Sequence, residues 1–180
     1  GSSHDIAGIQ IHDRRERNHS NSNPDIDFNR TKNNYCICDN TGGRSFNEYI
    51  DRQIAQRYTG KKSIRKDAVR MVTLLFTSDS EFFANKTLDE QRQFFQSCYE
   101  WAAKRWGAEN IISSYVHMDE DTPHMHLNLV PLTSDGRLSA KACIGNGSKA
   151  FQSLQDDFYK SVGVPYGLER GRRADLDNGE

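Results

Sequence analysis

The sequence predicts an α+β domain in which helices pack on one face of a largely antiparallel sheet. Three segments with clear helix start signals alternate with short runs of β-branched and aromatic residues. Their order is strand, strand, helix, strand, helix, strand, strand, helix, which lacks the strict βαβ alternation of a parallel sheet. A length of 180 residues with 35% hydrophobic side chains is typical of one domain with a proper core.

The helices are predicted from their capping residues. Ser45 with Glu48, and Thr87 with Glu90, match the S/T-x-x-E capping box, in which each residue satisfies a free backbone N–H of the other. Glycines that follow an apolar helical pattern mark the ends. The expected helices run from Ser45 to Gly60, from Thr87 to Gly107 and from Ala150 to Val162, with a shorter helix beginning at Ser78.

The strands are predicted from short apolar runs with a period of two. Residues 69–77 (VRMVTLLFT) are long enough to be central in the sheet. The other expected strands are residues 6–11, which end at His12, and residues 35–38, 111–117 and 124–131.

The domain is expected to cover residues 4–175. Residues 1–3 resemble a tag remnant, and the polar residues 176–180 suggest that the chain is cut from a longer protein with a C-terminal region. Residues 13–34 are rich in Asn, Ser, Asp and Arg without a period, which predicts a long loop or arm.

The formal net charge of −1 hides an uneven distribution. Residues 1–70 carry 13 Lys and Arg against 9 Asp and Glu, whereas residues 71–180 carry 11 against 16. A sum near zero can therefore conceal a basic face beside an acidic one. No apolar run is long enough to cross a bilayer, no signal peptide opens the chain, and the four cysteines show no CxxC spacing, so we expect a reduced, cytoplasmic protein without membrane insertion.

Residues 117–126 (HMDEDTPHMH) predict a metal site. His124 and His126 alternate along a strand and therefore point to the same face. If His117, at the end of the preceding strand, pairs with His124, all three imidazoles share that face at separations of about 5 to 7 Å. Such side chains can converge on one divalent ion at about 2.1 Å. The alternative is three solvated histidines on a surface hairpin.

Three neutral imidazoles suit Zn, Mn, Fe, Co or Ni, so ligand type alone does not select the metal. Three protein ligands without an obvious fourth describe an open site, as catalysis requires. The turn Asp119-Glu120-Asp121 adds carboxylates that could orient an imidazole or accept a proton.

A histidine pair on one strand with a third histidine upstream is similar to the metal site of the HUH nucleases. The wider pattern resembles the Mob/Pre relaxases, also called the MobV family, over nearly the whole chain and in the family's order. The matching stretches are His12-Asp13-Arg14-Arg15, Asn18 through Asp27 to Tyr35, Ile64 to Val69, Thr77-Ser78-Asp79, His117 to His126, Val130-Pro131, Gly136 to Lys141 and Gly167 to Gly171.

The resemblance implies the catalytic domain of a mobilization relaxase with an HUH relaxase-like two-layer sandwich. Such enzymes nick one DNA strand at an origin of transfer, stay attached to the new 5′ end and later reseal the strand. His12 matches the family's histidine nucleophile and Glu120 its acidic residue, while Arg15 and Arg65 fall where arginines are expected near the scissile phosphate. His117, His124 and His126 match the metal ligands, with Mn²⁺ or Mg²⁺ expected in function and Zn²⁺, Co²⁺ or Ni²⁺ possible in a crystal.

Two other nucleophiles stay open at this point, His19 and Tyr35. Tyr35 is an alternative because most HUH enzymes use tyrosine. Two other functions also stay open: an HUH replication initiator that uses Tyr35, and a non-enzymatic DNA-binding protein with a structural metal.

The expected partner is origin-of-transfer DNA, as a single strand at the nick with an adjacent hairpin or duplex, with a coupling protein or other relaxosome proteins as further partners in a bacterial cytoplasm. Nothing in this part of the chain supports oligomerisation. The 13–34 arm is expected to contact the DNA. The candidate phosphate contacts are Arg14, Arg15, Arg17, Arg30, Lys32, Lys61, Lys62, Arg65, Lys66, Lys141, Lys149, Arg172 and Arg173.

Overall fold

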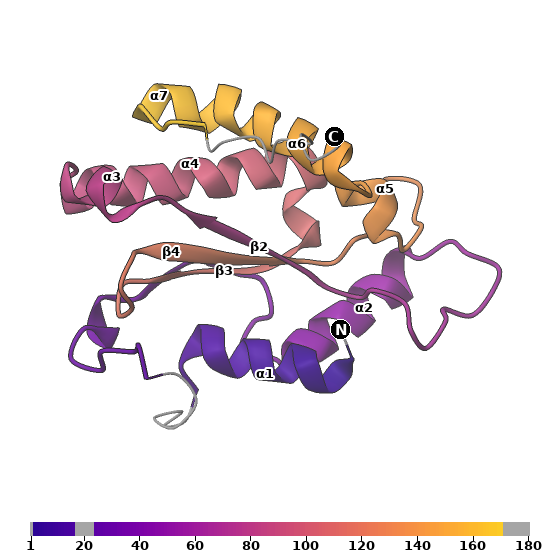
Figure 1. Cartoon of the computed structure of the whole chain (residues 1–180). Helices are drawn as coiled ribbons and strands as arrows, with labels where there is room; N and C mark the ends of the chain where they lie inside the picture. The colour runs from indigo at the N-terminus through magenta and orange to yellow at the C-terminus, as the bar shows by residue number, and fades with distance from the viewer. Residues whose placement is uncertain (1, 17–23, 171–180) are drawn as a thin grey trace, which may run out of the picture.

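The computed structural model describes residues 2–16 and 24–170, which form one four-stranded antiparallel sheet with helices around it (Figure 1). The strand order is β1-β3-β4-β2, and each neighbouring pair is antiparallel. The strands are β1 (Tyr35–Asp39), β2 (Val72–Thr77), β3 (Ile111–His117) and β4 (His124–Leu129). The prediction of an α+β fold with a largely antiparallel sheet is therefore confirmed.

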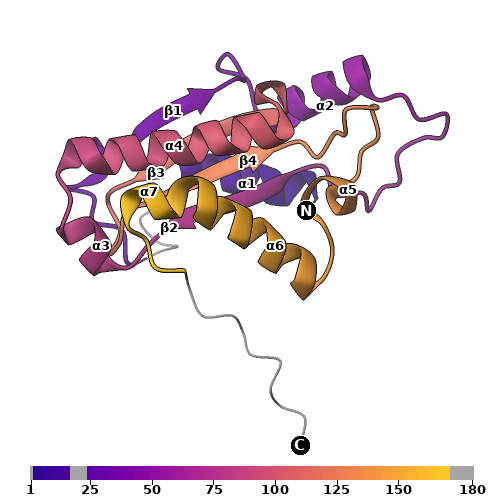
Figure 2. The ribbon, with the colours of Figure 1, turned by 90° about the horizontal axis from the view of Figure 1, so that it is seen from above.

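Helices form a layer on each face of the sheet rather than on one face alone. Helices α3, α4, α6 and α7 lie on one side, with α4 and α6 side by side, and α1 and α2 lie on the other (Figures 1 and 2). The helices are α1 (Ser3–Arg14), α2 (Phe46–Arg57), α3 (Ser80–Ala84), α4 (Leu88–Trp106), α5 (Ala140–Ile144), α6 (Ser148–Phe158) and α7 (Val164–Tyr166), with the short turns η1 (Thr31–Asn33), η2 (Ala108–Asn110) and η3 (Tyr159–Gly163).

The predicted strand at residues 6–11 is wrong, because this segment lies within α1. Ser2 and Asp5 form a capping box that starts the helix. Ile6 is buried and Ile9 packs against the same core, so the apolar residues follow a helical rather than a two-residue spacing. The helix also contains Asp13 and Arg14, so the predicted 13–34 arm begins inside it, and the middle of that arm, residues 17–23, lies outside the described residues.

The other helices begin close to their predicted positions. Both capping boxes, at Ser45 and Thr87, are present. Asp79 rather than Ser78 caps α3, and α2 ends at Arg57, before the expected stop at Gly60. Helix α6 passes into the turn η3 and α7, so the helical path continues through Gly163 to Tyr166.

Each face of the sheet has its own hydrophobic core. The core under α4 contains Phe94, Phe95 and Met125, whereas the core on the α1 and α2 side contains Ile6 and Phe46. At the turn between β3 and β4, Val116 and Met125 pair across the strands and point into the α4 core. Their neighbours along each strand therefore point to the α1 side, which is where the histidines lie.

Among the described residues, no helix is long and apolar enough to span a membrane.

Candidate metal centre at the β3–β4 turn

The three histidines of the 117–126 segment form one cluster. His117 pairs with His124 across the hairpin, and Tyr115 pairs with His126, as the sequence predicts for the first pair. The three ring centroids lie 5.0 to 5.3 Å apart. His117 is fully buried, while His124 and His126 are partly accessible, so the cluster opens to solvent on the β4 side.

One nitrogen of each imidazole contacts a protein oxygen. His117 Nε2 lies 3.1 Å from the Asp13 carbonyl, His124 Nδ1 lies 2.8 Å from the Thr122 carbonyl, and His126 Nδ1 lies 2.9 Å from the Asp13 carboxylate. If these nitrogens carry the proton, the other nitrogen of each ring keeps a free lone pair. This is the arrangement found around histidines that ligate metals.

The free nitrogens fit a divalent cation. His117 Nδ1 is buried without a hydrogen-bond partner among the described residues, which is costly unless an ion or other ligand meets it. Burial, with the nearby charge of Arg15, lowers the pKa of His117 to about 3, so the ring is neutral and available as a ligand at neutral pH. Single ligand atoms of His117, Glu120 and His124 lie within 4.8 Å of one another, as do those of His12, His117 and His126.

His12 reaches the cluster from helix α1. Its ring stacks on that of His126 at 5.2 Å between centroids and meets the edge of His117 at 5.1 Å. Its Nε2 lies 3.9 Å from Glu120 Oε1. Burial, followed by the charges of Arg15 and His126, lowers the pKa of His12, which favours the neutral imidazole with a nucleophilic lone pair.

Asp13, the residue after His12, connects the helix to the sheet. Asp13 is 2% exposed, and its carboxylate accepts a 2.6 Å hydrogen bond from Asn128 Nδ2 in addition to its contact with His126. The backbone carbonyl of the same residue meets His117. The sequence does not identify Asp13 as a site residue when residues 13–34 are predicted to be a loop. The helical spacing of Ile6, Ile9 and Asp13 is the signal that points to it.

Arg15 holds the acidic turn against α1. It adopts the left-handed conformation, with φ of 51°, at the end of the helix. Its guanidinium donates to both oxygens of Asp119 at 2.8 and 3.1 Å and to Glu120 at 2.8 Å. Its Nη1 lies 3.2 Å from His12 Nδ1, so the structure places Arg15 beside His12, and two carboxylates already share its charge.

Asp119 is a buried residue of the acidic turn that accepts hydrogen bonds from several segments of the chain. Besides Arg15, its carboxylate accepts hydrogen bonds from Thr31 Oγ1 and Asn34 Nδ2, each at 2.8 Å. Burial opposes its charge, but the hydrogen bonds outweigh burial and hold the pKa of the carboxyl well below its ordinary value. The η1 segment, the turn and the end of α1 are therefore joined through one buried carboxylate.

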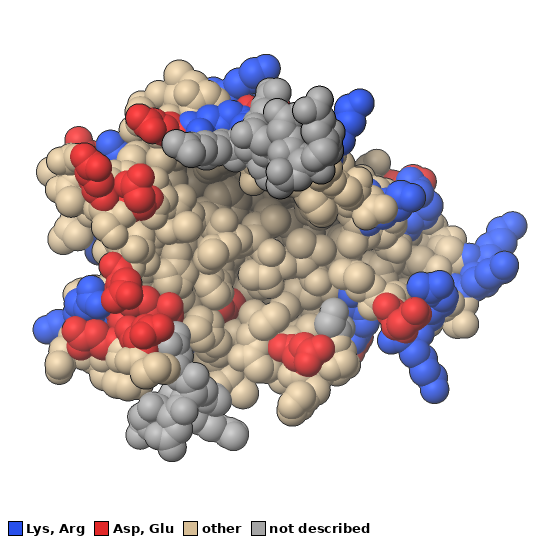
Figure 3. Space-filling model, viewed as in Figure 1, with Lys and Arg blue, Asp and Glu red and all other residues tan. Residues whose placement is uncertain are grey.

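The structure does not bring Arg65 to the histidines. Its side chain is 80% exposed and pairs with Asp67 in the connection between α2 and β2, beside a pocket that Lys141 also lines. That connection projects from the end of the molecule opposite the β3–β4 turn, and lysine and arginine side chains gather there (Figures 1 and 3). The exposed basic residues of the connection are Lys61, Lys62, Arg65 and Lys66.

The other predicted phosphate contacts differ in availability. Arg14 pairs with Asp39 and Glu16, so protein carboxylates already hold its guanidinium. Arg30 pairs with Asp27 and reaches the Glu120 carbonyl, close to the acidic turn, and Lys32 and Lys149 are exposed. Arg17, Arg172, Arg173 and His19 lie outside the described residues.

Tyr35 lies on the other face of the sheet. It pairs with Val116, so its ring points to the α4 side, where Arg92 sits over it at 5.2 Å. Burial raises the pKa of Tyr35 to about 12, which disfavours the phenolate. The β3 and β4 strands thus separate this hydroxyl from the histidine cluster.

The chain is similar to known plasmid proteins over its whole length. The Mob_Pre family, described as "Plasmid recombination enzyme", matches residues 2–178. A plasmid recombination enzyme type 3 from Staphylococcus aureus is 45% identical over 95% of this chain and 41% of that protein, and a type 1 enzyme from the same species is 42% identical over 96% and 42%. This chain therefore spans about two fifths of the length of these relatives.

Solved structures show the same fold. The MobM relaxase domain, in a Mn-bound complex with oriT DNA of plasmid pMV158, superimposes with a TM-score of 0.88 and 29% identity over 100% of this chain and 90% of that chain. A second Mn-bound complex of that domain gives a TM-score of 0.86 at the same identity.

Proposed function

The chain belongs to the Mob_Pre family of plasmid recombination enzymes, and we propose that it is a metal-dependent domain that nicks and rejoins one DNA strand at an origin of transfer. One observation carries this proposal. His12, a histidine from α1, lies against the rings of His117 and His126, and one nitrogen of each of His117, His124 and His126 is held by a protein oxygen. A nucleophile and a cation site within a few ångströms of each other suit phosphoryl transfer.

The reaction begins with an in-line attack of a neutral His12 nitrogen on the scissile phosphorus. The N–P bond forms as the P–O3′ bond breaks, which leaves the 5′ phosphate on His12 and a 3′ oxygen that takes a proton to become a hydroxyl. The reverse attack by a 3′ hydroxyl restores the phosphodiester. Because the phosphoramidate keeps the energy of the broken bond, resealing needs no ATP.

His117, His124 and His126 would hold a divalent cation, Mn²⁺ or Mg²⁺ in this proposal. When bound, that cation supplies positive charge that offsets the negative charge on the non-bridging phosphate oxygens. Glu120 lies 3.9 Å from His12 and 3.8 Å from His124, where it orients the imidazoles and is placed to hold a proton. Arg15 Nη1 lies beside the His12 ring while Nη2 of the same guanidinium donates to Glu120, so Arg15 positions the ring against the acidic turn.

Two alternatives have less support. A replication initiator with Tyr35 as nucleophile requires a hydroxyl that lies on the other face of the sheet with a raised pKa. A DNA-binding protein with a structural metal would close the site with a fourth ligand. His12 is the fourth imidazole here, and its partly exposed ring beside the accessible His126 suits substrate contact better than closure.

The test is a covalent adduct measured by mass spectrometry. The probes are the pMV158 oriT oligonucleotide present in the similar complexes and single-stranded oligonucleotides tiled across the DNA that flanks this chain's own gene. With Mn²⁺ we expect cleavage and a 5′-phosphoryl adduct on the peptide that contains His12, and with EDTA we expect neither.

The variants identify the nucleophile. His12→Ala is expected to remove the adduct, while Tyr35→Phe keeps it. His4→Ala is the matched control, because His4 is exposed on the same helix and lies two turns before His12. An adduct that persists in His12→Ala contradicts the histidine mechanism, and no adduct on any probe contradicts the strand-transfer function.

A further inference from the structure

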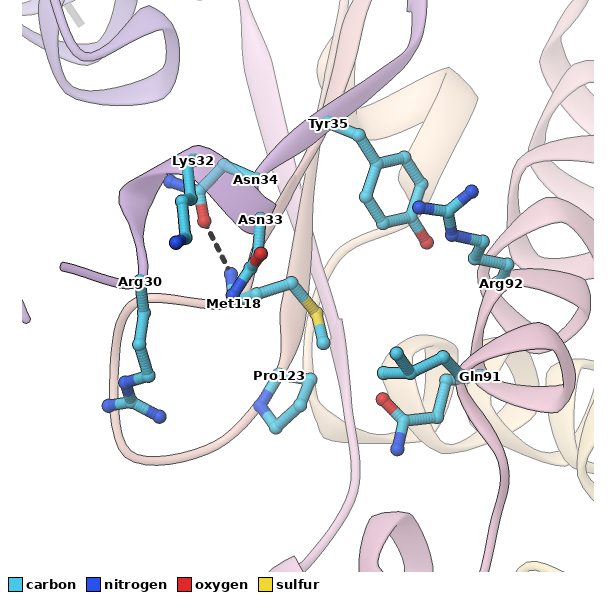
Figure 4. A pocket seen from close by; sticks show the side chains of 10 residues that line it. Arg30, Lys32, Asn33, Asn34, Tyr35, Gln91, Arg92, Met118 and Pro123 are labelled. Carbon is cyan, nitrogen blue, oxygen red and sulfur yellow. Dashed lines mark hydrogen bonds between the residues drawn. The ribbon is translucent and has the colours of Figure 1, made fainter.

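We propose that the pocket between η1, the β3–β4 turn and the start of α4 binds one nucleotide of the single strand that runs past the histidines, with the base inside and the phosphate at its basic rim. This proposal rests on the proposed function, because it assumes that single-stranded DNA reaches the turn. Figure 4 shows the lining of the pocket, which includes Tyr35 and Gln91 and none of the clustered histidines.

The pocket has the size and charge for a nucleotide. Its volume is about 430 Å³, within the range of small-ligand sites. Of the described residues that line it, none is acidic, and three are basic: Arg30, Lys32 and Arg92. No carboxylate of the described residues pairs with Lys32 or Arg92, so both cations remain available to a phosphate.

Two buried polar atoms in the lining have no partner among the described residues. Gln91 is 9% exposed, and its Nε2 donates to the carbonyls of Phe83 and Lys86 at 3.0 and 3.3 Å. These bonds determine the orientation of the amide, so Gln91 Oε1 is left as an acceptor without a donor. The hydroxyl of Tyr35 is the second such atom.

Both atoms suit the edge of a nucleobase. An exocyclic amino group or a ring N–H can donate to Gln91 Oε1, and a base can donate to or accept from the Tyr35 hydroxyl. An apolar ligand would leave both atoms unsatisfied at a cost in binding free energy. The lining therefore favours a base over a purely hydrophobic occupant.

Apolar side chains supply the surface for the flat face of the base. Leu88, at the first turn of α4, is 67% exposed, and Met118 and Pro123 come from the β3–β4 turn. Met118 follows His117 and Pro123 precedes His124, so the pocket and the candidate metal centre share the same turn. We therefore expect one strand of DNA that passes this turn to reach both sites.

Another pocket of the molecule shows the contrast. The pocket beside Trp106 is about 720 Å³ and is lined by Glu109 and Asp135 as well as by three arginines. Glu109 pairs with Arg57 and Asp135 pairs with Arg137, so carboxylates already hold two of these arginines and volume alone does not make a nucleotide site.

The first experiment uses the methionine methyl groups, since the chain has three methionines. With [¹³C-methyl]-methionine protein in EDTA, we titrate dAMP, dGMP, dCMP and dTMP and single-stranded 12-mers of each base. The ring current of a bound base is expected to shift the Met118 methyl signal. The signals of Met71 and Met125, which are buried in the two cores, are expected to stay in place.

The second experiment fills the pocket. Leu88→Trp adds bulk at an exposed position and is expected to weaken binding of the 12-mers about tenfold, the loss of one stacked base. Gln155→Trp, at an exposed position on α6, is the matched control and is expected to bind like the parent. Tyr35→Phe removes a hydroxyl that makes no hydrogen bond to a described residue, so it is expected to keep the fold while changing the order of affinities among the four bases.

The outcomes separate this proposal from the strand-transfer function. If the Met118 signal stays in place and Leu88→Trp binds within twofold of the parent while Mn²⁺-dependent adduct formation persists, the nucleotide pocket is wrong and the function stands. If the Met118 signal shifts but no adduct forms, the pocket stands and the function fails.

Discussion

Replacing Asp13 with Asn is expected to weaken Mn²⁺ binding about 10- to 100-fold, the usual cost of losing a carboxylate behind a metal-ligating histidine. Asp13 touches no metal in this proposal and acts by positioning His126 and His117. The change keeps the shape of the side chain but replaces one acceptor oxygen with an NH₂ group. Its effect therefore depends on which partners that group meets.

The structure determines the size of the effect on stability. Asn128 is oriented by Thr73, whose hydroxyl donates to Asn128 Oδ1 at 2.6 Å, so Asn128 Nδ2 must face Asp13. In the Asp13→Asn variant either this NH₂ group or the His126 N–H meets a second donor. Loss of a hydrogen bond to a charged group, with a buried donor left unpaired, is expected to lower the free energy of unfolding by about 2 to 4 kcal/mol.

A second substitution tests the reasoning. In the double variant Asp13→Asn/Asn128→Asp the polarity of the pair is reversed, so the new amide on α1 donates to the new carboxylate on β4, and Thr73 still donates to that carboxylate. We expect most of the lost stability to return. Calorimetric titration with MnCl₂ measures the affinity, and urea unfolding in EDTA measures stability; Asp89→Asn, at an exposed position on α4, is the control for charge. A Kd for Asp13→Asn within twofold of the parent would refute the positioning role.

Two further predictions concern stability. Asp119→Asn breaks the buried pair with Arg15 and is expected to lower the free energy of unfolding at pH 7 by about 3 kcal/mol. Because the folded pKa of Asp119 lies below the unfolded value, its stabilisation is complete above about pH 4 and is lost as the pH falls through the folded pKa; urea unfolding from pH 7 to pH 3 should be less pH-dependent in the variant, and parallel profiles would contradict this. Gly136→Ala is expected to cost about 2 kcal/mol or more, since φ is +81° and a Cβ would lie 2.5 Å from the Arg57 carbonyl oxygen. Gly147→Ala, with the same φ and open space around it, is the control, and an equal Tm for the two variants would show that the contact costs nothing.

The clustering of the three histidines was predictable because its geometry is local. A six-residue turn joins two strands, and the two-residue period of a strand places His124 and His126 on the face of His117 once the hairpin register is known. The capping boxes at Ser45 and Thr87 were predictable for the same reason, since each involves residues three apart in the chain.

The N-terminal part of the site was not predictable to the same degree, because its contacts span more than 100 residues of sequence. The local sequence of residues 6–13 does not indicate that Asp13 contacts His126 and Asn128. The resemblance to the family points to His12. The strand predicted for residues 6–11 is wrong, however, so the sequence did not reveal the helix that brings Asp13 to the sheet. A short apolar segment fits either period, and the Ser2 capping box was the local feature that favoured the helix.

The positions of the charged residues explain more about the proposed contacts with DNA than the net charge of the chain does. The carboxylates of the acidic turn beside the histidines suggest a site for a cation. Arg15, however, neutralises much of their negative charge by pairing with Asp119 and Glu120. An arginine that two carboxylates share has little attraction left for a phosphate. In the proposed reaction a cation held by His117, His124 and His126 would offset the charge of the scissile phosphate, while exposed basic residues such as Lys32 and those of the α2–β2 connection remain available to hold the DNA on either side.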